Sequence, residues 1–189
     1  LSGTSDVAPL DGRDMPRKLT HIVFNAADAE ATATTPEEVL GFTVSDRTKA
    51  MVFVRCNEVH HCTAFARAGY SSLNHIAFHM DDTDAVMRGL GRMRDHGFAP
   101  SWGPGRHGPG ANVFGYFIAP FGAVIEYSGP VEIVPEDYAA GAPDDWTWPP
   151  GRMSSNQPSL APTVIRVDLV TTSGTTPPRP GGGPRHAPR

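Results

Sequence analysis

Residues 19–24, Leu19-Thr-His21-Ile-Val-Phe24, recur as Leu73-Asn-His75-Ile-Ala-Phe78, 54 residues further along the chain. Each copy is a short apolar run that carries one histidine at its third position. Two dipeptides recur downstream in the same order, Gly41-Phe42 with Gly97-Phe98 and Val52-Phe53 with Val113-Phe114. Three ordered matches predict a duplicated structural unit, because repeated units preserve the order of their elements.

Each unit reads as a strand, a helix and a group of short strands. In the second unit Asp81 or Asp82 can cap the helix, and Gly97 can end it in a left-handed conformation. The apolar stripe of this helix is Val86, Leu90 and Met93. In the first unit residues 31–36, ATATTP, are rich in threonine, and proline fits only a first turn. We therefore expect only a short helix there, from about Pro36 to Leu40.

The expected strands after the helices cover 51–56, 61–66, 112–118 and 122–128. The pattern predicts an α+β fold, with two βαβββ modules that form one half-open, cup-shaped mixed sheet and helices on its outer face. The modules are expected at 19–72 and 73–150, the second including a closing segment. Residues 1–18 read as a linker. Residues 151–189 read as a flexible tail rich in Pro, Gly and Arg, with too little apolar surface to offset its ordering entropy.

Charge and composition exclude several classes of partner. The 189 residues carry 20 acidic and 16 basic side chains, a net charge of −4, so we expect no nucleic-acid partner. No apolar run approaches the roughly 20 residues of a membrane span, and the first residues lack the basic start and apolar stretch of a signal peptide. The two cysteines, Cys56 and Cys62, form no disulfide framework. We expect a cytoplasmic protein, with both cysteines acting as packing residues.

Strand alternation places His21 and His75 on one face of the sheet, and Glu126 can point to the same side. The opposite face, with Ile22, Phe24, Ile76 and Phe78, should pack on the helices. Two imidazoles and one carboxylate leave three positions of a metal open, which suits non-haem Fe(II), oxygen and a chelating substrate. The alternative is that the histidines are satisfied core residues and that Glu126 is an edge-strand charge. A glutamate is seldom buried unpaired, which favours the metal.

Six stretches within about residues 18–130 carry a family resemblance: LTHIVF, VLGFTVSDR, CNEVHHCTAFA, LNHIAFHM, GPGRHGPGANVFGYF and AVIEYSG. In order and spacing they resemble the type I extradiol ring-cleavage dioxygenases, enzymes like catechol 2,3-dioxygenase in the vicinal oxygen chelate, or glyoxalase–bleomycin resistance, superfamily. PDDWTWPPGR, at 143–152, looks like the closing segment of small members. A chain of this length corresponds to such a small member, or to the catalytic half of a larger one whose other half would precede Leu1.

The resemblance implies a ring-opening enzyme of aromatic catabolism that acts on a small aromatic diol with O2. It implies Fe(II) as cofactor, with Mn(II) possible. By the same resemblance the metal ligands are His21, His75 and Glu126. The catalytic residues are His61 as acid–base, His107 as a pocket hydrogen-bonding group, and Tyr116 as the group that holds the substrate's hydroxyl oxygen. His60 is expected on the opposite strand face from His61, in a structural role.

Two rival functions on the same fold remain open. A glyoxalase-like isomerase or lyase generally needs a further ligand from the last strand of the first module. That strand reads HHCTAFA and has no carboxylate, which leaves His61 or Cys62. A non-enzymatic drug-binding protein would not need His21, His75 and Glu126 together. We also expect a homodimer or larger homo-oligomer, because a two-unit cup leaves sheet edges that need covering.

Overall fold

The structure is a computed structural model that describes residues 12–146 of the chain. The predicted tail at 151–189 lies outside the described residues, as do residues 1–11. The elements in chain order are η1 Gly12–Asp14, β1 Lys18–Ala26, α1 Ala29–Leu40, β2 Thr43–Arg47, β3 Met51–Arg55, β4 Thr63–Arg67, β5 Ser72–His79, α2 Thr83–Asp95, β6 Trp102–Arg106, β7 Val113–Ile118 and β8 Val124–Ser128. The predicted βαβββ order, twice over, is confirmed.

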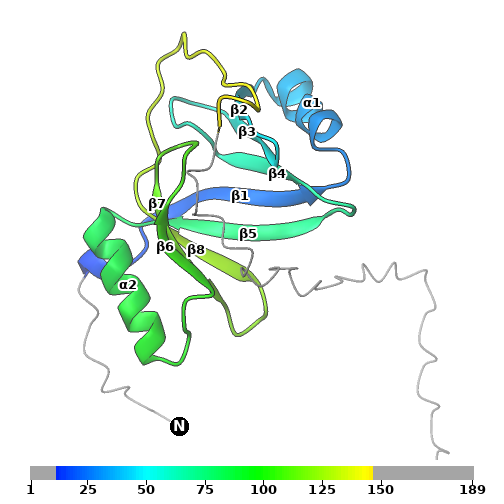
Figure 1. Cartoon of the computed structure of the whole chain (residues 1–189). Helices are drawn as coiled ribbons and strands as arrows, with labels where there is room; N and C mark the ends of the chain where they lie inside the picture. Colours follow the sequence, from blue (N-terminus) through cyan, green and yellow to red (C-terminus); the bar gives the residue numbers. More distant parts are fainter. Residues whose placement is uncertain (1–11, 147–189) are drawn as a thin grey trace, which may run out of the picture.

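The eight strands within residues 12–146 belong to one open mixed sheet, in the order β2-β3-β4-β1-β5-β8-β7-β6. The two central strands, β1 and β5, are antiparallel neighbours, and each opens one copy of the repeat. Each is also parallel to the last strand of its own unit, β4 or β8. Figure 1 shows α1 beside the β2–β4 end of this sheet and α2 beside the β6–β8 end. The α+β fold class is therefore confirmed, and the topology brings the repeated histidine strands together.

Helix α2 forms as the sequence predicts. Asp82 is its N-cap and accepts a hydrogen bond from the backbone N–H of Ala85 at 2.6 Å. Gly97 follows the helix with a φ of 88°, a left-handed conformation that favours glycine. The buried face of the helix packs on β7 and β8, and its core cluster is Met80, Ala85, Val86, Leu90, Phe117, Ala119, Ile125 and Tyr127. A Cβ on Gly115 would clash with the side chain of Leu90, so this close approach requires a glycine.

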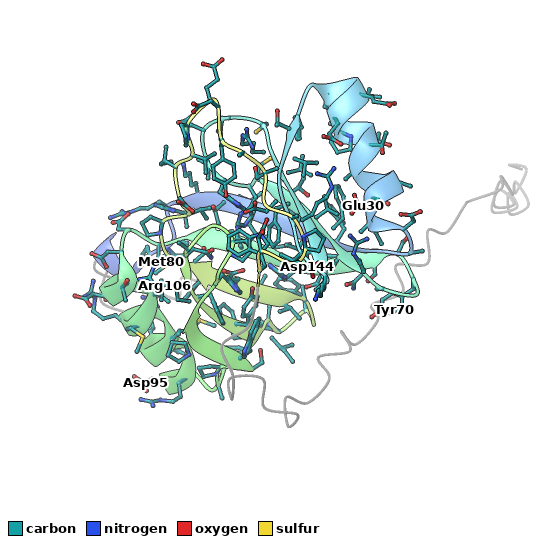
Figure 2. All side chains as sticks on the ribbon, turned by 45° about the horizontal axis from the view of Figure 1, so that its top comes forward. Glu30, Tyr70, Met80, Asp95, Arg106 and Asp144 are labelled. Carbon is teal, nitrogen blue, oxygen red and sulfur yellow. The ribbon has the colours of Figure 1, made fainter. Side chains whose placement is uncertain are left out.

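Helix α1 is longer than the predicted short helix from about Pro36. It begins at Ala29, and the carboxylate of Asp28 caps it by accepting from the backbone N–H of Ala31 at 3.0 Å. Glu30 binds Arg47 on β2 and Arg67 on β4. The small residues Ala29 and Ala33 of α1 pack on a cluster formed by Ala26, Val44, Val52, Val54 and Phe65. Tertiary packing thus outweighs the weak helix propensity of a threonine-rich segment and tolerates an internal proline. Figure 2 shows Glu30 on α1 and Met80 near α2.

The outer face of the central strands is only partly covered by helices. Ile76 and Phe78 pack against the α2 cluster, as predicted. The same prediction is wrong for Phe24, whose residue surface is 40% exposed, because α1 packs over the neighbouring strands instead of over β1. Between the segment 15–17 and strands β1, β5, β7 and β8 lies a mainly apolar groove of about 620 Å³. Within residues 12–146 no helix is both long and apolar enough to cross a membrane.

Candidate metal centre

His21, His75 and Glu126 meet in the interior, on three neighbouring strands. The register pairs His21 with Ala77 across β1 and β5, and Ala77 with Glu126 across β5 and β8. One ligand atom from each side chain lies within 4.8 Å of the other two, and all three residues are buried. The Oε2 atom of Glu126 is 3.2 Å from Nε2 of His21 and 3.1 Å from Nε2 of His75. The three groups that the repeat predicted are thus assembled at one point.

Two asparagines orient the ligands. The Oδ1 atom of Asn74 lies 2.7 Å from Nδ1 of His75 and accepts a hydrogen bond from the N–H there, which leaves Nε2 of that ring with a lone pair. The amide of Asn112 donates to Oε1 of Glu126 at 3.1 Å, so that Oε2 is the carboxylate oxygen left facing the histidines. Outer hydrogen bonds of this kind fix the orientation of metal ligands.

The donor set fits a divalent metal. Nε2 of His75 is buried without a hydrogen-bond partner, although it lies beside the Glu126 carboxylate. A buried polar atom without a hydrogen bond is costly, and a metal would satisfy it. Burial would raise the pKa of Glu126, but the neighbouring His21 and His75 hold it well below the usual range, so the side chain is a carboxylate. Burial lowers the pKa of His75 more than that carboxylate raises it, so the ring is the neutral form that binds metals.

His61 lies against the metal ligands. Its ring centroid is 4.5 Å from that of His21, and it is 3% exposed. A Cβ on Gly110 would come within 2.9 Å of Cε1 of His61, so this glycine leaves room for the ring. Burial first, and then the charges of His21 and His60, hold the pKa of His61 well below the usual value.

His60 does not point away from His61, contrary to the prediction. The Nδ1 atoms of the two rings are 2.9 Å apart, and His60 is completely buried. The prediction failed because β4 begins at Thr63. The two histidines therefore lie in the connection before the strand, where alternation of faces does not apply. On its other side Nε2 of His60 is 2.6 Å from Oδ2 of Asp46.

His107 and Tyr116 complete the predicted set on the other side of Glu126. Nε2 of His107 is 3.2 Å from the Tyr116 hydroxyl and 3.9 Å from Oε1 of Glu126. The Tyr116 ring stacks on Trp102 and meets His75 edge-on, and His107 stacks on Phe114. Burial, followed by the Glu126 carboxylate, raises the pKa of Tyr116 well above its usual value, so its hydroxyl stays a donor. Burial lowers the pKa of His107 to about 4.

All six residues singled out from the sequence thus surround one point. The sequence analysis assigned no role to Asn74, Asn112, Trp102 or Asp46. Two features of the sequence could have pointed to two of them. Asn74 directly precedes His75, and Asp46 lies within the motif VLGFTVSDR. The prediction that both cysteines are packing residues is wrong for Cys56, which is exposed at the end of β3, whereas Cys62 is half-buried.

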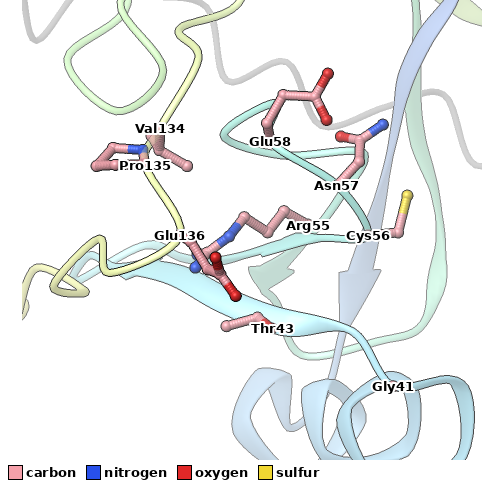
Figure 3. A pocket seen from close by; sticks show the side chains of 9 residues that line it. All are labelled: Gly41, Thr43, Arg55, Cys56, Asn57, Glu58, Val134, Pro135 and Glu136. Atoms are coloured by element: carbon pink, nitrogen blue, oxygen red, sulfur yellow. The ribbon is translucent and has the colours of Figure 1, made fainter.

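A separate polar pocket of about 270 Å³ lies beside the site, between the ends of β2 and β3 and the segment 134–136. Figure 3 shows it with Arg55 among its lining residues. Arg55 also donates to Ser45, and its guanidinium lies 5.8 Å from the centre of the Tyr138 ring. The lining contains no metal-centre residue, so this pocket is a neighbour of the site and not its entrance.

The chain belongs to the Glyoxalase/Bleomycin resistance protein/Dioxygenase superfamily, whose family model matches residues 18–127. This range contains both α-helices, all six predicted site residues and the eight described strands except for Ser128, the last residue of β8. The predicted superfamily is therefore confirmed.

Known relatives divide between two activities. Metapyrocatechase 2 of Cupriavidus necator is 28% identical over 142 residues, which are 74% of this chain and 42% of that protein. The Mn(II)-bound glyoxalase of Novosphingobium aromaticivorans is 37% identical, with a TM-score of 0.65 over 72% of this chain and 46% of that one. The 2,2',3-trihydroxybiphenyl 1,2-dioxygenase of Sphingomonas wittichii strain RW1 is 25% identical, with a TM-score of 0.59 over 66% and 46%. The chain spans less than half the length of each.

Proposed function

We propose that the chain is an extradiol dioxygenase that opens the ring of a small aromatic diol with O2. The observation that carries the proposal is the grouping of His61, His107 and Tyr116 around a cluster of two histidines and one carboxylate. Three protein ligands on a metal leave three positions open, as a bidentate diol and oxygen require. The dioxygenase relatives support the same reaction class.

Three side chains have separate roles in proton transfer and hydrogen bonding. His61 lies close enough to the ligands to accept a proton from a bound diol and to return it when the ring opens. Its buried, neutral imidazole is available as a base at neutral pH, because its pKa is held low. Tyr116, kept protonated by its surroundings, donates a hydrogen bond to an anionic ring oxygen. His107 supplies a second polar contact next to Tyr116.

The bound metal would supply the site where the diol and oxygen meet, and it would neutralise their charge. We propose Fe(II), with Mn(II) as the alternative, because nitrogen and carboxylate donors of this kind accept both ions. The Mn(II)-bound relative is consistent with this pair of ions.

The test is anaerobic reconstitution with Fe(II), followed by oxygen uptake on a panel of catechols. We expect one O2 consumed per diol and a yellow ring-opened product. Tyr116→Phe, which keeps the ring and its stacking but loses the hydroxyl, should retain iron and turn over more slowly. Iron-loaded protein that binds catechols tightly and takes up no oxygen would overturn the proposal.

A glyoxalase-like isomerase is the second candidate, because the glyoxalase relative has the higher identity, 37%. Against it, β4 reads TAFAR and offers no carboxylate as a fourth ligand. Isomerase activity on a hemithioacetal by the Mn(II)-loaded protein, without oxygen uptake on diols, would establish this candidate in place of the first.

We also propose a homodimer or larger homo-oligomer, supported by the mostly exposed edge strand β6 and by the apolar groove on the outer face. Sedimentation as a monomer at tens of micromolar would contradict it.

We propose the same two modules as from the sequence, at 19–72 and 73–150. A cytoplasmic location is supported by the two cysteines, which are free thiols.

A further inference from the structure

A chain of three buried side chains leads from His61 to a carboxylate behind it. Nδ1 of His61 is 2.9 Å from Nδ1 of His60, and Nε2 of His60 is 2.6 Å from Oδ2 of Asp46. Asp46 and His60 have no exposed surface, and His61 is 3% exposed. The metal ligands use none of these contacts, so the chain needs its own explanation.

Asp46 is an acceptor on all sides. Its Oδ1 atom accepts from the backbone N–H of Gly141 at 2.6 Å, and the hydroxyl of Tyr138 lies 3.2 Å from Oδ2. An ionised carboxylate has no proton to donate. Nε2 of His60 must therefore carry the proton of the 2.6 Å bond.

The direction of the remaining bond follows from what His61 has to do. A base that takes a proton at Nε2 must carry its own ring proton at Nδ1. That proton needs an acceptor, and within residues 12–146 Nδ1 of His60, 2.9 Å away, is in position to accept it. His60 is then neutral, with its proton on Nε2 facing Asp46. This series of hydrogen bonds is consistent because it ends on the Asp46 carboxylate, which only accepts hydrogen bonds.

We propose that Asp46 and His60 are positioning residues that set the tautomer of His61, leaving Nε2 of His61 as the free lone pair facing the reaction site. This inference rests on the proposed function, because it assumes that His61 acts as a base. It extends that function because two residues that touch neither metal nor substrate, Asp46 and His60, would determine which nitrogen of His61 acts as the base.

Asp46→Asn is the decisive variant, because Gly141 determines how the new amide lies. The backbone N–H of Gly141 requires an oxygen opposite it, so the amide NH2 group must face His60. His60 then accepts at Nε2 and donates from Nδ1. His61 consequently receives a hydrogen bond at Nδ1 and carries its own proton at Nε2. The substitution therefore reverses the direction of both hydrogen bonds, and the size and shape of the side chain at position 46 hardly change.

His60→Gln is the complementary variant. A glutamine amide can donate to Asp46 and accept from His61, so it preserves the direction of both bonds. Asp144→Asn is the matched control. It makes the same chemical change at an exposed residue of the closing segment (Figure 2), whose carboxylate pairs with Lys49.

The readout is the ¹⁵N spectrum of the His61 ring in the full chain loaded with diamagnetic Zn(II), assigned by its absence in His61→Phe. We expect the Nδ1–H tautomer in the unchanged chain, in His60→Gln and in Asp144→Asn, and the Nε2–H tautomer in Asp46→Asn. In the iron-loaded protein Asp46→Asn should lower kcat by about 10² to 10⁴, with KM little changed. His60→Gln should stay within about tenfold of the unchanged chain, because the acid–base group itself is retained.

An Nδ1–H tautomer of His61 in a folded Asp46→Asn protein, or an Nε2–H tautomer in the unchanged chain, would overturn the inference. A different result would overturn the proposed function alone. In it, Asp46→Asn changes the His61 tautomer as predicted, but the iron-loaded protein never consumes oxygen with a diol. The tautomer assignment would then stand. The spectrum therefore separates the two failures. A circular dichroism melt identifies any variant that has lost its fold, and His60→Gln then tests the direction independently.

Discussion

Replacing Asn112 by leucine removes a hydrogen bond to Glu126, a proposed metal ligand, while leaving all three proposed ligands in place. Asn112 is fully buried, and its amide donates to Oε1 of Glu126 at 3.1 Å and to the hydroxyl of Ser128 at 2.8 Å. Leucine has nearly the same size but no donor. Glu126 then lacks the contact that keeps Oε2 directed towards His21 and His75. We expect Asn112→Leu to bind metal more weakly without losing it.

The magnitude follows from the kind of bond that is lost. A hydrogen bond to a charged group contributes about 1.5–3 kcal/mol. Part of that loss falls on the metal-free state too, because Glu126 is ionised there as well. The remaining part corresponds to about 10- to 100-fold weaker metal affinity, at about 1.4 kcal/mol per factor of ten, in the range seen when outer partners of ligands are removed.

The assay is competition for Zn(II) or Mn(II) against a chromogenic chelator, with thermal melts of the metal-free proteins to confirm folding. Ser128→Ala is the control, since it removes the other partner of Asn112 and keeps the contact with Glu126. It should change metal affinity little. Equal affinities for Asn112→Leu and the unchanged chain would refute the reasoning, and so would equal losses in Asn112→Leu and Ser128→Ala.

Three further predictions address the ligands, the acid–base residue and pH. His75→Ala should lose metal retention and activity together while staying folded, as checked by metal analysis and circular dichroism; a fully active variant with bound iron would contradict the assignment. His61→Phe should keep its iron and lose about 10² to 10⁴ in kcat; loss of the iron would instead make His61 a ligand. In the metal-free protein the free energy of unfolding should fall as the pH drops from about 6.5 to about 4, because the pKa of His107 is lowered to about 4 in the folded state and the unfolded chain binds its proton first. At about 1.4 kcal/mol per pH unit this is up to about 3 kcal/mol, and His107→Gln should show a shallower fall in denaturant titrations.

The grouping of His21, His75 and Glu126 was predictable because it depends mainly on local features of the sequence. A duplicated apolar strand fixes the same position twice, and strand alternation decides which side chains share a face. Pairing of the two repeated strands then places His21 opposite Ala77, next to His75 and Glu126. Only this last step depends on contacts between distant parts of the chain.

The failed predictions depend on long-range contacts. The start of α1 is decided by packing against β2, β3 and β4, which its own threonine-rich segment does not reveal. His60 was assigned to the wrong face because alternation was applied to a connection that is not a strand. Its true partner, Asp46, is 14 residues away in the chain, and only the folded structure places the two side chains at 2.6 Å.

The two buried histidines His75 and His61 differ in what lies behind the ring, and that difference suits their separate proposed roles. Nδ1 of His75 faces the amide oxygen of Asn74, a neutral acceptor that fixes the ring without adding charge next to Glu126. Nδ1 of His61 faces His60, behind which stands the Asp46 carboxylate. A carboxylate behind His75 would add a second negative charge beside the metal. Behind His61 the same charge favours the imidazolium that forms when the base accepts a proton, because opposite charges in a buried site attract strongly. A neutral amide therefore suits a ligand that must stay uncharged, and a carboxylate suits a base that must become charged.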